Sequence, residues 1–130
     1  MQAVRNQSEG DKKCAKYLKD YFPPKFTYQD FGPMLWMDFF NATDIAQMIV
    51  NSGAKYLAFT SKHHDGFCNF PSTYSYGWNS MDVGPRRDVV GELKEAFAPY
   101  SDFHFGLYYS LFEWYNPIYL KDKANNKTIR

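Results

Sequence analysis

Two short apolar runs with a helical pattern between them constrain the fold of this 130-residue chain most strongly. The run at 56–59 has the length and composition of a strand buried on both faces. The run at 103–110, FHFGLYYS, predicts a second strand, and the stretch 88–97 between them has helical spacing. Two strands joined through a helix lie parallel in one sheet. The sequence therefore predicts a β/α fold, which binds ligands at the carboxyl ends of its strands.

Helix start and stop signals flank both predicted helices. Thr43 is expected to cap a helix before the first strand, and Gly53 is expected to end it. Asp88 is the expected N-cap of the helix between the strands. The apolar face of that helix consists of Val89, Leu93 and Phe97.

Less regular segments surround these elements. Residues 1–20 are polar and rich in lysine, which predicts a loosely held helix or a poorly ordered segment. The stretch YFPPKFTYQDFG, residues 21–32, is expected to be extended and pinned by its aromatic side chains, because its two prolines disfavour a helix. The composition of 61–87 predicts a long loop.

Charge and composition exclude several classes of function. The formal net charge is +1, and no basic stripe indicates nucleic-acid binding. The apolar stretches are too short and polar to span a membrane, and no signal-peptide pattern opens the chain. Three N-glycosylation sequons, at Asn6, Asn41 and Asn126, favour the secretory route weakly. Cys14 and Cys68 are expected to be separate thiols, with a disulfide in an oxidising compartment as the alternative.

The adjacent histidines His63 and His64 follow the first predicted strand directly. Where the strand ends the chain must turn, so both imidazoles can face one pocket. A zinc site is disfavoured because adjacent histidines diverge and His104 lies early in the second strand, at the opposite end. No G-x-S-x-G elbow, P-loop or dinucleotide fingerprint is present.

Sugar chemistry fits the residues better, because it needs hydroxyl-binding polar groups, aromatic rings and two carboxyls. The polar and aromatic candidates are His63, His64, Trp78, Tyr108, Tyr109 and Trp114. The candidate carboxylates are Asp65, Asp82, Asp88, Glu92 and Glu113. Simpler roles compete for all five: turns for Asp65 and Asp82, the helix cap for Asp88, a solvated helix face for Glu92, and a structural or indirect role for Glu113.

Two further features of the sequence allow alternative interpretations. Arg86 or Arg87 is expected to pair with a buried carboxylate and fix the long loop, and binding of an anionic substrate is the alternative. Tyr108 and Tyr109 alternate along the strand, so only one of them can face the interior.

The segment AKYLAFTSKHHDGFCNFPSTYSYGWNSMDVGPRRDVVGELKEAF resembles the α-L-fucosidases of glycoside hydrolase family 29. GLYYSLFEW and YFPPKFTYQDFGP extend the resemblance over roughly residues 20–123, most closely to the animal lysosomal and secreted enzymes. It implies an α/β fold, an incomplete portion of a (β/α)8 TIM-like barrel in residues 20–130, preceded by a poorly matched polar segment, 1–19. It also implies retaining hydrolysis of terminal α-L-fucose without metal or organic cofactor.

The resemblance also assigns site residues. It implies that His63 and His64 hold hydroxyls of fucose, with one of Tyr108 and Tyr109 lining the pocket and Trp78 shaping its wall. The substrate partners would be fucosylated glycans, and the full-length enzyme would be a lysosomal or secreted glycoprotein and a homo-oligomer, without nucleic-acid or membrane partners.

Several parts of the family pattern are missing from these residues. Three segments are not found: the W-x-D-G segment that carries the nucleophile, the first-strand His-Trp-Gly motif, and the Glu-Trp-Phe segment before YFPP. In addition, Cys68 stands where the family has a threonine-like residue. The nucleophile and the general acid are therefore expected beyond Arg130. A barrel takes about 250 residues, so we expect a fragment or truncated product without hydrolytic activity of its own. The alternatives are a truncated, non-catalytic fucose-binding paralogue and a structural subunit that completes a barrel with another chain.

Overall fold

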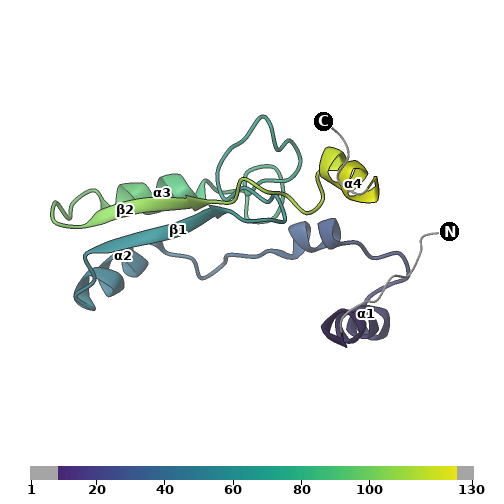
Figure 1. Ribbon diagram of the computed structural model, residues 1–130. Coiled ribbons are helices and arrows are strands. Elements are labelled where there is room, and N and C mark those ends of the chain that lie inside the picture. The colour runs from purple at the N-terminus through teal and green to yellow at the C-terminus, as the bar shows by residue number, and fades with distance from the viewer. Residues whose placement is uncertain (1–8, 126–130) are drawn as a thin grey trace. The chain divides into compact units, whose positions relative to one another are not determined.

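The computed structural model describes residues 9–125, and the chain divides into two compact units, Met1–Phe31 and Gly32–Arg130. Figure 1 shows the elements of both units. The expected boundary between residues 19 and 20 stays a prediction. Among the described residues, no helix has the length and hydropathy that crossing a membrane requires.

The first unit contains α1 (Glu9–Tyr21), which agrees with the helix expected within residues 1–20. Phe22, Phe26 and Phe31 form an aromatic cluster with ring centroids 4.4–5.3 Å apart, so this segment is pinned by aromatic rings as predicted. The expectation of a fully extended segment is wrong, because a 3-10 helix, η1 (Tyr28–Met34), begins here.

Local hydrogen bonds explain the start of η1. The Asp30 carboxylate accepts hydrogen bonds from the backbone N–H of Thr27 at 2.6 Å and from its hydroxyl at 2.8 Å. These bonds hold the pKa of Asp30 below its ordinary value. Pro33 lies late in η1, where its fixed φ fits the 3-10 conformation.

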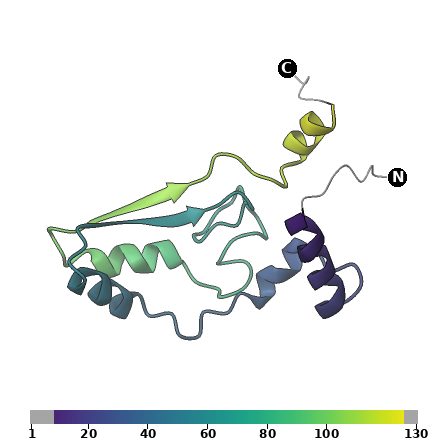
Figure 2. The ribbon, with the colours of Figure 1, turned by 60° about the horizontal axis from the view of Figure 1, so that its bottom comes forward.

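The second unit is built on two parallel strands, β1 (Tyr56–Lys62) and β2 (His104–Tyr109), as predicted. Helices α2 (Ala42–Asn51) and α3 (Val89–Phe97) lie together along the sheet, and α4 (Pro117–Ala124) follows β2 (Figure 2). The buried core consists of Ala42, Ala46, Val89, Leu93 and Phe97. Leu57, Phe59 and Phe105 pack against it from the strands. The predicted apolar face of α3 is thereby confirmed.

The helix signals are confirmed in part. Asp88 caps α3, since its carboxylate accepts from the N–H of Gly91 at 2.9 Å. Gly53 follows the end of α2 with φ of 85°, the left-handed conformation expected of a terminating glycine. The predicted Thr43 cap is wrong: Asn41 caps α2, accepting from Thr43 N at 3.0 Å and Asp44 N at 3.2 Å.

The expectation that the first strand is buried on both faces is wrong for the described residues. Exposure alternates along β1, with Leu57 and Phe59 half-buried and Tyr56 72% exposed. Within this part of the chain the helices pack on one face of the sheet only, so the other face is open.

Cys14 is exposed and Cys68 is buried, and both are free thiols, as expected. The sequon asparagine Asn41 is exposed at the start of α2. Asn6 and Asn126 lie outside the described residues.

Candidate functional site

A β-bulge at the carboxyl end of β1 begins the candidate site. The register with β2 shifts between Thr60, opposite Tyr108, and Lys62, opposite Tyr109. The alternation of exposed and half-buried residues stops there, and both Ser61 and Lys62 are 1% exposed. Bulges redirect side chains in this way. The residue after the bulge, His63, is exposed.

A tight turn then carries both histidines. The backbone N–H of Gly66 donates to the carbonyl of His63 at 3.0 Å, and Gly66 has φ of 83°, which glycine adopts without strain. The imidazole rings of His63 and His64 lie with centroids 4.5 Å apart, tilted by 59°. The turn thus brings the two rings together, as the position at a strand end suggested.

The end of β2 and the segment after it bring two aromatic rings to the histidines. The Tyr108 ring centroid lies 6.1 Å from that of His63. The Trp114 ring lies 6.2 Å from His63, edge to face, and 5.4 Å from His64. The backbone N–H of Trp114 donates to the His64 carbonyl at 2.7 Å. We call His63, His64, Tyr108 and Trp114 the histidine cluster.

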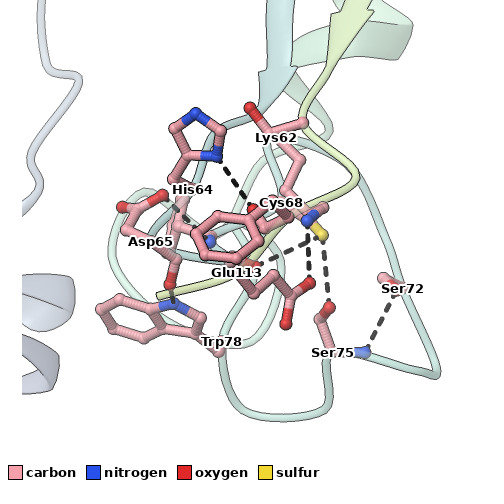
Figure 3. Close-up of polar contacts among 12 residues, drawn as sticks. Lys62, His64, Asp65, Cys68, Ser72, Ser75, Trp78 and Glu113 are labelled. Carbon is pink, nitrogen blue, oxygen red and sulfur yellow. Dashed lines mark hydrogen bonds and ion pairs between the residues drawn. The ribbon is translucent and has the colours of Figure 1, made fainter. Parts of the chain in front are cut away.

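A backbone contact fixes the tautomer of His64. Its Nδ1 lies 3.0 Å from the carbonyl oxygen of Phe112, a bond drawn in Figure 3. Because a carbonyl oxygen only accepts, Nδ1 carries the proton in this bond. The neutral ring therefore has its lone pair on Nε2, which can accept a hydrogen bond from a ligand hydroxyl.

Tyr108 and Tyr109 take different directions from β2. The Tyr108 hydroxyl accepts a hydrogen bond from Ser110 Oγ at 3.1 Å and lies on the side of His63. The Tyr109 ring instead lies 4.6 Å from the ammonium of Lys62. Tyr108 is therefore the tyrosine that joins the histidine cluster.

Trp78 braces the turn that carries the histidines. Its indole N–H donates to the carbonyl of Asp65 at 3.0 Å, as Figure 3 shows, and its ring meets that of Phe67 edge to face at 5.1 Å. A Cβ on Gly32 would lie 2.8 Å from a Trp78 ring carbon, so the glycine allows this close packing. The contacts with Asp65 and Phe67 hold Trp78 against the turn.

An ion pair between a buried lysine and a partly exposed glutamate lies beside the histidine cluster, and the sequence did not lead us to its lysine. Lys62 is 1% exposed, and its ammonium lies 2.8 Å from Oε1 of Glu113, which is 33% exposed (Figure 3). The available signal was a lysine at the end of an apolar strand, directly before the Asp-containing turn at 63–66. The expectation that Glu113 has a structural or indirect role agrees with this contact.

Asp82 and Asp65 behave as turn residues, as expected. The Asp82 carboxylate accepts from the N–H of Gly77 at 2.9 Å and the Asn79 amide at 2.7 Å, which lowers its pKa. Asp65 Oδ1 accepts from the Phe67 N–H at 3.4 Å. Burial, and then the charge of Asp65, raises the pKa of Tyr115.

The expectation of a solvated Glu92 is wrong, because Glu92 pairs with Arg87. Arg87 Nε donates to Glu92 at 2.8 Å, a second guanidinium nitrogen binds the other carboxylate oxygen, and a third donates to the Phe40 carbonyl at 3.1 Å. The hydrogen bonds from Arg87 hold the pKa of Glu92 below its ordinary value. An arginine does fix the end of the long loop, although its partner is only partly buried.

In the described part of the chain, the histidine cluster is largely exposed and the side chains form no metal centre. Among the described residues no group of three or more His, Cys, Asp or Glu side chains could hold a metal ion. A surface hollow of about 780 Å³ is lined by residues 38–44 together with Arg87, Glu92, Glu95 and Ala96, none of which belongs to the cluster. The cluster itself is open, with Tyr108 44% and Trp114 47% exposed.

Comparison with known proteins identifies the relatives of this chain. The sequence model of the family described as alpha-L-fucosidase matches residues 2–130. The α-L-fucosidase of Branchiostoma floridae is 55% identical over 88% of this chain and 25% of its own length. The human plasma α-L-fucosidase is 48% identical over 92% of this chain and 26% of its own length. The crystal structure of Thermotoga maritima α-fucosidase in complex with fucose matches with a TM-score of 0.72 and 33% identity, over 82% of this chain and 25% of that one. The chain thus spans about a quarter of the length of these relatives.

Proposed function

Because this chain belongs to the α-L-fucosidase family, we propose that the complete polypeptide containing it is a retaining α-L-fucosidase that releases terminal α-L-fucose from glycans. The observation that carries the proposal is the histidine cluster, which gathers two imidazoles and two aromatic rings at the carboxyl ends of β1 and β2. Parallel α/β folds bind their ligands at this end. The Thermotoga relative, described as a complex with fucose, supports the choice of sugar.

The barrel architecture is part of the proposal. Residues 20–130 form a portion of a (β/α)8 barrel in which β1 and β2 are neighbouring strands, and residues 1–19 precede it. The open face and edges of the two-stranded sheet support this, since Tyr56 is 72% and Leu107 is 51% exposed. Further strands and helices of the complete polypeptide would cover these surfaces.

The geometry of the histidine cluster supports a role for each of its residues in this proposal. His64 accepts a hydrogen bond from a fucose hydroxyl at Nε2, because the Phe112 carbonyl holds the proton on Nδ1. His63, the more exposed imidazole, binds a neighbouring hydroxyl. The Tyr108 hydroxyl and the Trp114 ring bound the same space, the ring offering an apolar surface to the sugar. Trp78 and Tyr109 contribute through the framework, by bracing Asp65 and Lys62.

The two catalytic carboxyls come from outside these 130 residues. Each candidate within them already has a structural partner: Glu113 pairs with Lys62, Asp82 with Asn79, Asp88 with the N–H of Gly91, Glu92 with Arg87, and Asp65 with the N–H of Phe67. The nucleophile and the general acid lie beyond Arg130, and the segment alone is inactive. No metal or organic cofactor takes part in this reaction as the resemblance describes it.

Location and assembly complete the proposal. The protein is a lysosomal or secreted glycoprotein and forms a homo-oligomer. The names of the plasma and tissue relatives support the location, and the exposed sequon at Asn41 supports glycosylation. The alternative function is a non-catalytic fucose-binding protein. Two observations favour it: the cluster offers groups that bind hydroxyls, and every candidate carboxylate already has a structural partner.

The test uses the complete polypeptide that contains these residues. Its hydrolysis of 4-nitrophenyl α-L-fucoside and its affinity for L-fucose are both measured. We expect turnover, and a fall of about a hundredfold or more in kcat/KM for His64→Phe, which cannot accept a hydrogen bond. His104→Phe is the matched control, since His104 begins β2 at its opposite end, and should stay within about twofold of wild type. Binding without turnover would establish the alternative. A protein that neither binds nor cleaves would contradict both functions.

A further inference from the structure

We propose that Lys62 and Glu113 are a positioning pair, which sets the separation between the two histidines and Trp114 and is not needed for the fold itself. The proposal rests on the proposed function, because its consequence is the affinity of the histidine cluster for fucose. It assigns a role to two charged residues that do not belong to the cluster.

The burial of Lys62 needs an explanation other than stability. Its side chain is 1% exposed, with the Glu113 carboxylate at 2.8 Å and the Tyr109 ring at 4.6 Å as neighbours of its ammonium. Removing an ammonium and a carboxylate from water costs free energy that their attraction barely recovers. An apolar pair of similar volume would be about as stable at this position. What the ion pair adds is a fixed distance between two segments.

The position of each charge links that distance to the site. Lys62 directly precedes His63, and Glu113 directly precedes Trp114. In both segments the charged residue is less exposed than the ring that follows it. Lys62 is buried and His63 is exposed, and Glu113 is less exposed than Trp114. A rotation or shift that separated the charges would therefore also move the rings apart.

The backbone joins the same two segments. Ser110 N–H donates to the Lys62 carbonyl at 3.0 Å, and Trp114 N–H donates to the His64 carbonyl at 2.7 Å. Glu113 lies between Ser110 and Trp114 along the chain, so its ion pair with Lys62 joins the two segments between these bonds (Figure 3), in addition to the bond from His64 Nδ1 to the Phe112 carbonyl. Residues 110–114 form no regular element, so these contacts hold them in place.

Gly66 lies next to the carboxylate of Glu113. A Cβ on Gly66 would lie 3.6 Å from both Cδ and Oε2 of Glu113. The turn that carries the histidines thus packs against the same carboxylate that binds Lys62. Glu113 contacts both the strand end and the turn, which places it at the centre of this framework.

The experiment separates positioning from stabilisation. In the complete polypeptide, Lys62→Met leaves a partly buried carboxylate unpaired, so the informative variant is the double substitution Lys62→Met/Glu113→Gln, in which neither charge remains. We measure its unfolding midpoint, its KM and kcat on 4-nitrophenyl α-L-fucoside, and its Kd for L-fucose by calorimetry. The matched control, Lys16→Met/Asp20→Asn, removes the exposed ion pair of α1 with the same change in charge.

We expect the double variant to keep the unfolding midpoint of wild type and to bind L-fucose at least about tenfold more weakly, while the control changes neither. A double variant that binds fucose as wild type does would overturn the proposal. So would one that loses its fold, because the pair would then be a stabilising element. Wild-type protein that does not bind fucose would instead contradict the proposed function, so the two failures are distinguishable.

Discussion

Replacing Arg87 by methionine should loosen the end of the long loop. The guanidinium binds both carboxylate oxygens of Glu92 and the Phe40 carbonyl, and it lies 5.0 Å from the Phe40 ring. Methionine retains most of the aliphatic length but none of these donors. The Arg87 backbone N–H, which donates to the Ser80 carbonyl at 2.8 Å, remains and reports on the loop.

The expected cost is modest because the ion pair is partly in water. Both side chains are 33% exposed, so screening limits their attraction to about 0.5–1 kcal/mol. The bond to the Phe40 carbonyl contributes about 1 kcal/mol and the ring contact about 0.5 kcal/mol. The sum, about 2 kcal/mol, corresponds to roughly 30-fold faster local opening.

Hydrogen exchange of residues 78–92 in the complete polypeptide measures this opening. Arg87→Met should exchange about 30-fold faster than wild type at neutral pH. Lys94→Met, an exposed lysine on the same helix α3, is the control and should exchange as wild type does.

The effect also has a predicted pH dependence. The pKa of Glu92 in the fold is lowered from 4.5, mainly by the hydrogen bonds from Arg87. A group with a lowered folded pKa stabilises above its unfolded value and loses this contribution as pH falls through the folded value. The difference between Arg87→Met and wild type should therefore be full at neutral pH and shrink progressively below pH 4.5. An unchanged exchange rate at neutral pH, or a difference that grows in acid, would refute this reasoning.

Three further substitutions test other parts of the structure. Phe97→Ala should lower the free energy of unfolding by about 3–5 kcal/mol in denaturant titrations, because Phe97 is 3% exposed and stacks on Phe103 and Phe105; a loss below about 1 kcal/mol would contradict its place in the core. Asn41→Ala should cost about 1 kcal/mol in the same titration and Thr43→Ala much less, and the reverse order would restore Thr43 as the cap. Gly66→Ala and Gly77→Ala both replace glycines of positive φ, 83° and 71°, where an alanine is strained; only Gly66 lies in the turn that carries the histidines, so calorimetry should show weaker fucose binding for Gly66→Ala alone, and equal affinities would contradict the dependence of the histidine cluster on this turn.

Local sequence signals predicted the elements that depend on local interactions. The strand–helix–strand order, the Asp88 cap and the apolar face of α3 all follow from periodicity and capping preferences. The cap of α2 shows the limit of such signals, since Asn41 and Thr43 are both good caps and lie two residues apart. The start of the 3-10 helix η1 depends on two hydrogen bonds from Thr27 to the Asp30 carboxylate, which the two prolines of this stretch did not indicate.

The site depends on contacts that sequence patterns do not encode. Two adjacent histidines at a strand end indicated a ligand-binding edge, and their rings do lie together. The bulge at Ser61 was not predictable, because it arises from the pairing of β1 with β2. Lys62 was overlooked for the same reason: its partner Glu113 is 51 residues further along the chain.

A crystal structure of the complete polypeptide with L-fucose would show whether the histidine cluster binds the sugar. We expect fucose at the cluster, with a sugar hydroxyl within about 3.2 Å of His64 Nε2 and Nδ1 still bound to the Phe112 carbonyl. Fucose bound elsewhere, with both ring nitrogens of His64 out of reach of the sugar, would contradict this expectation.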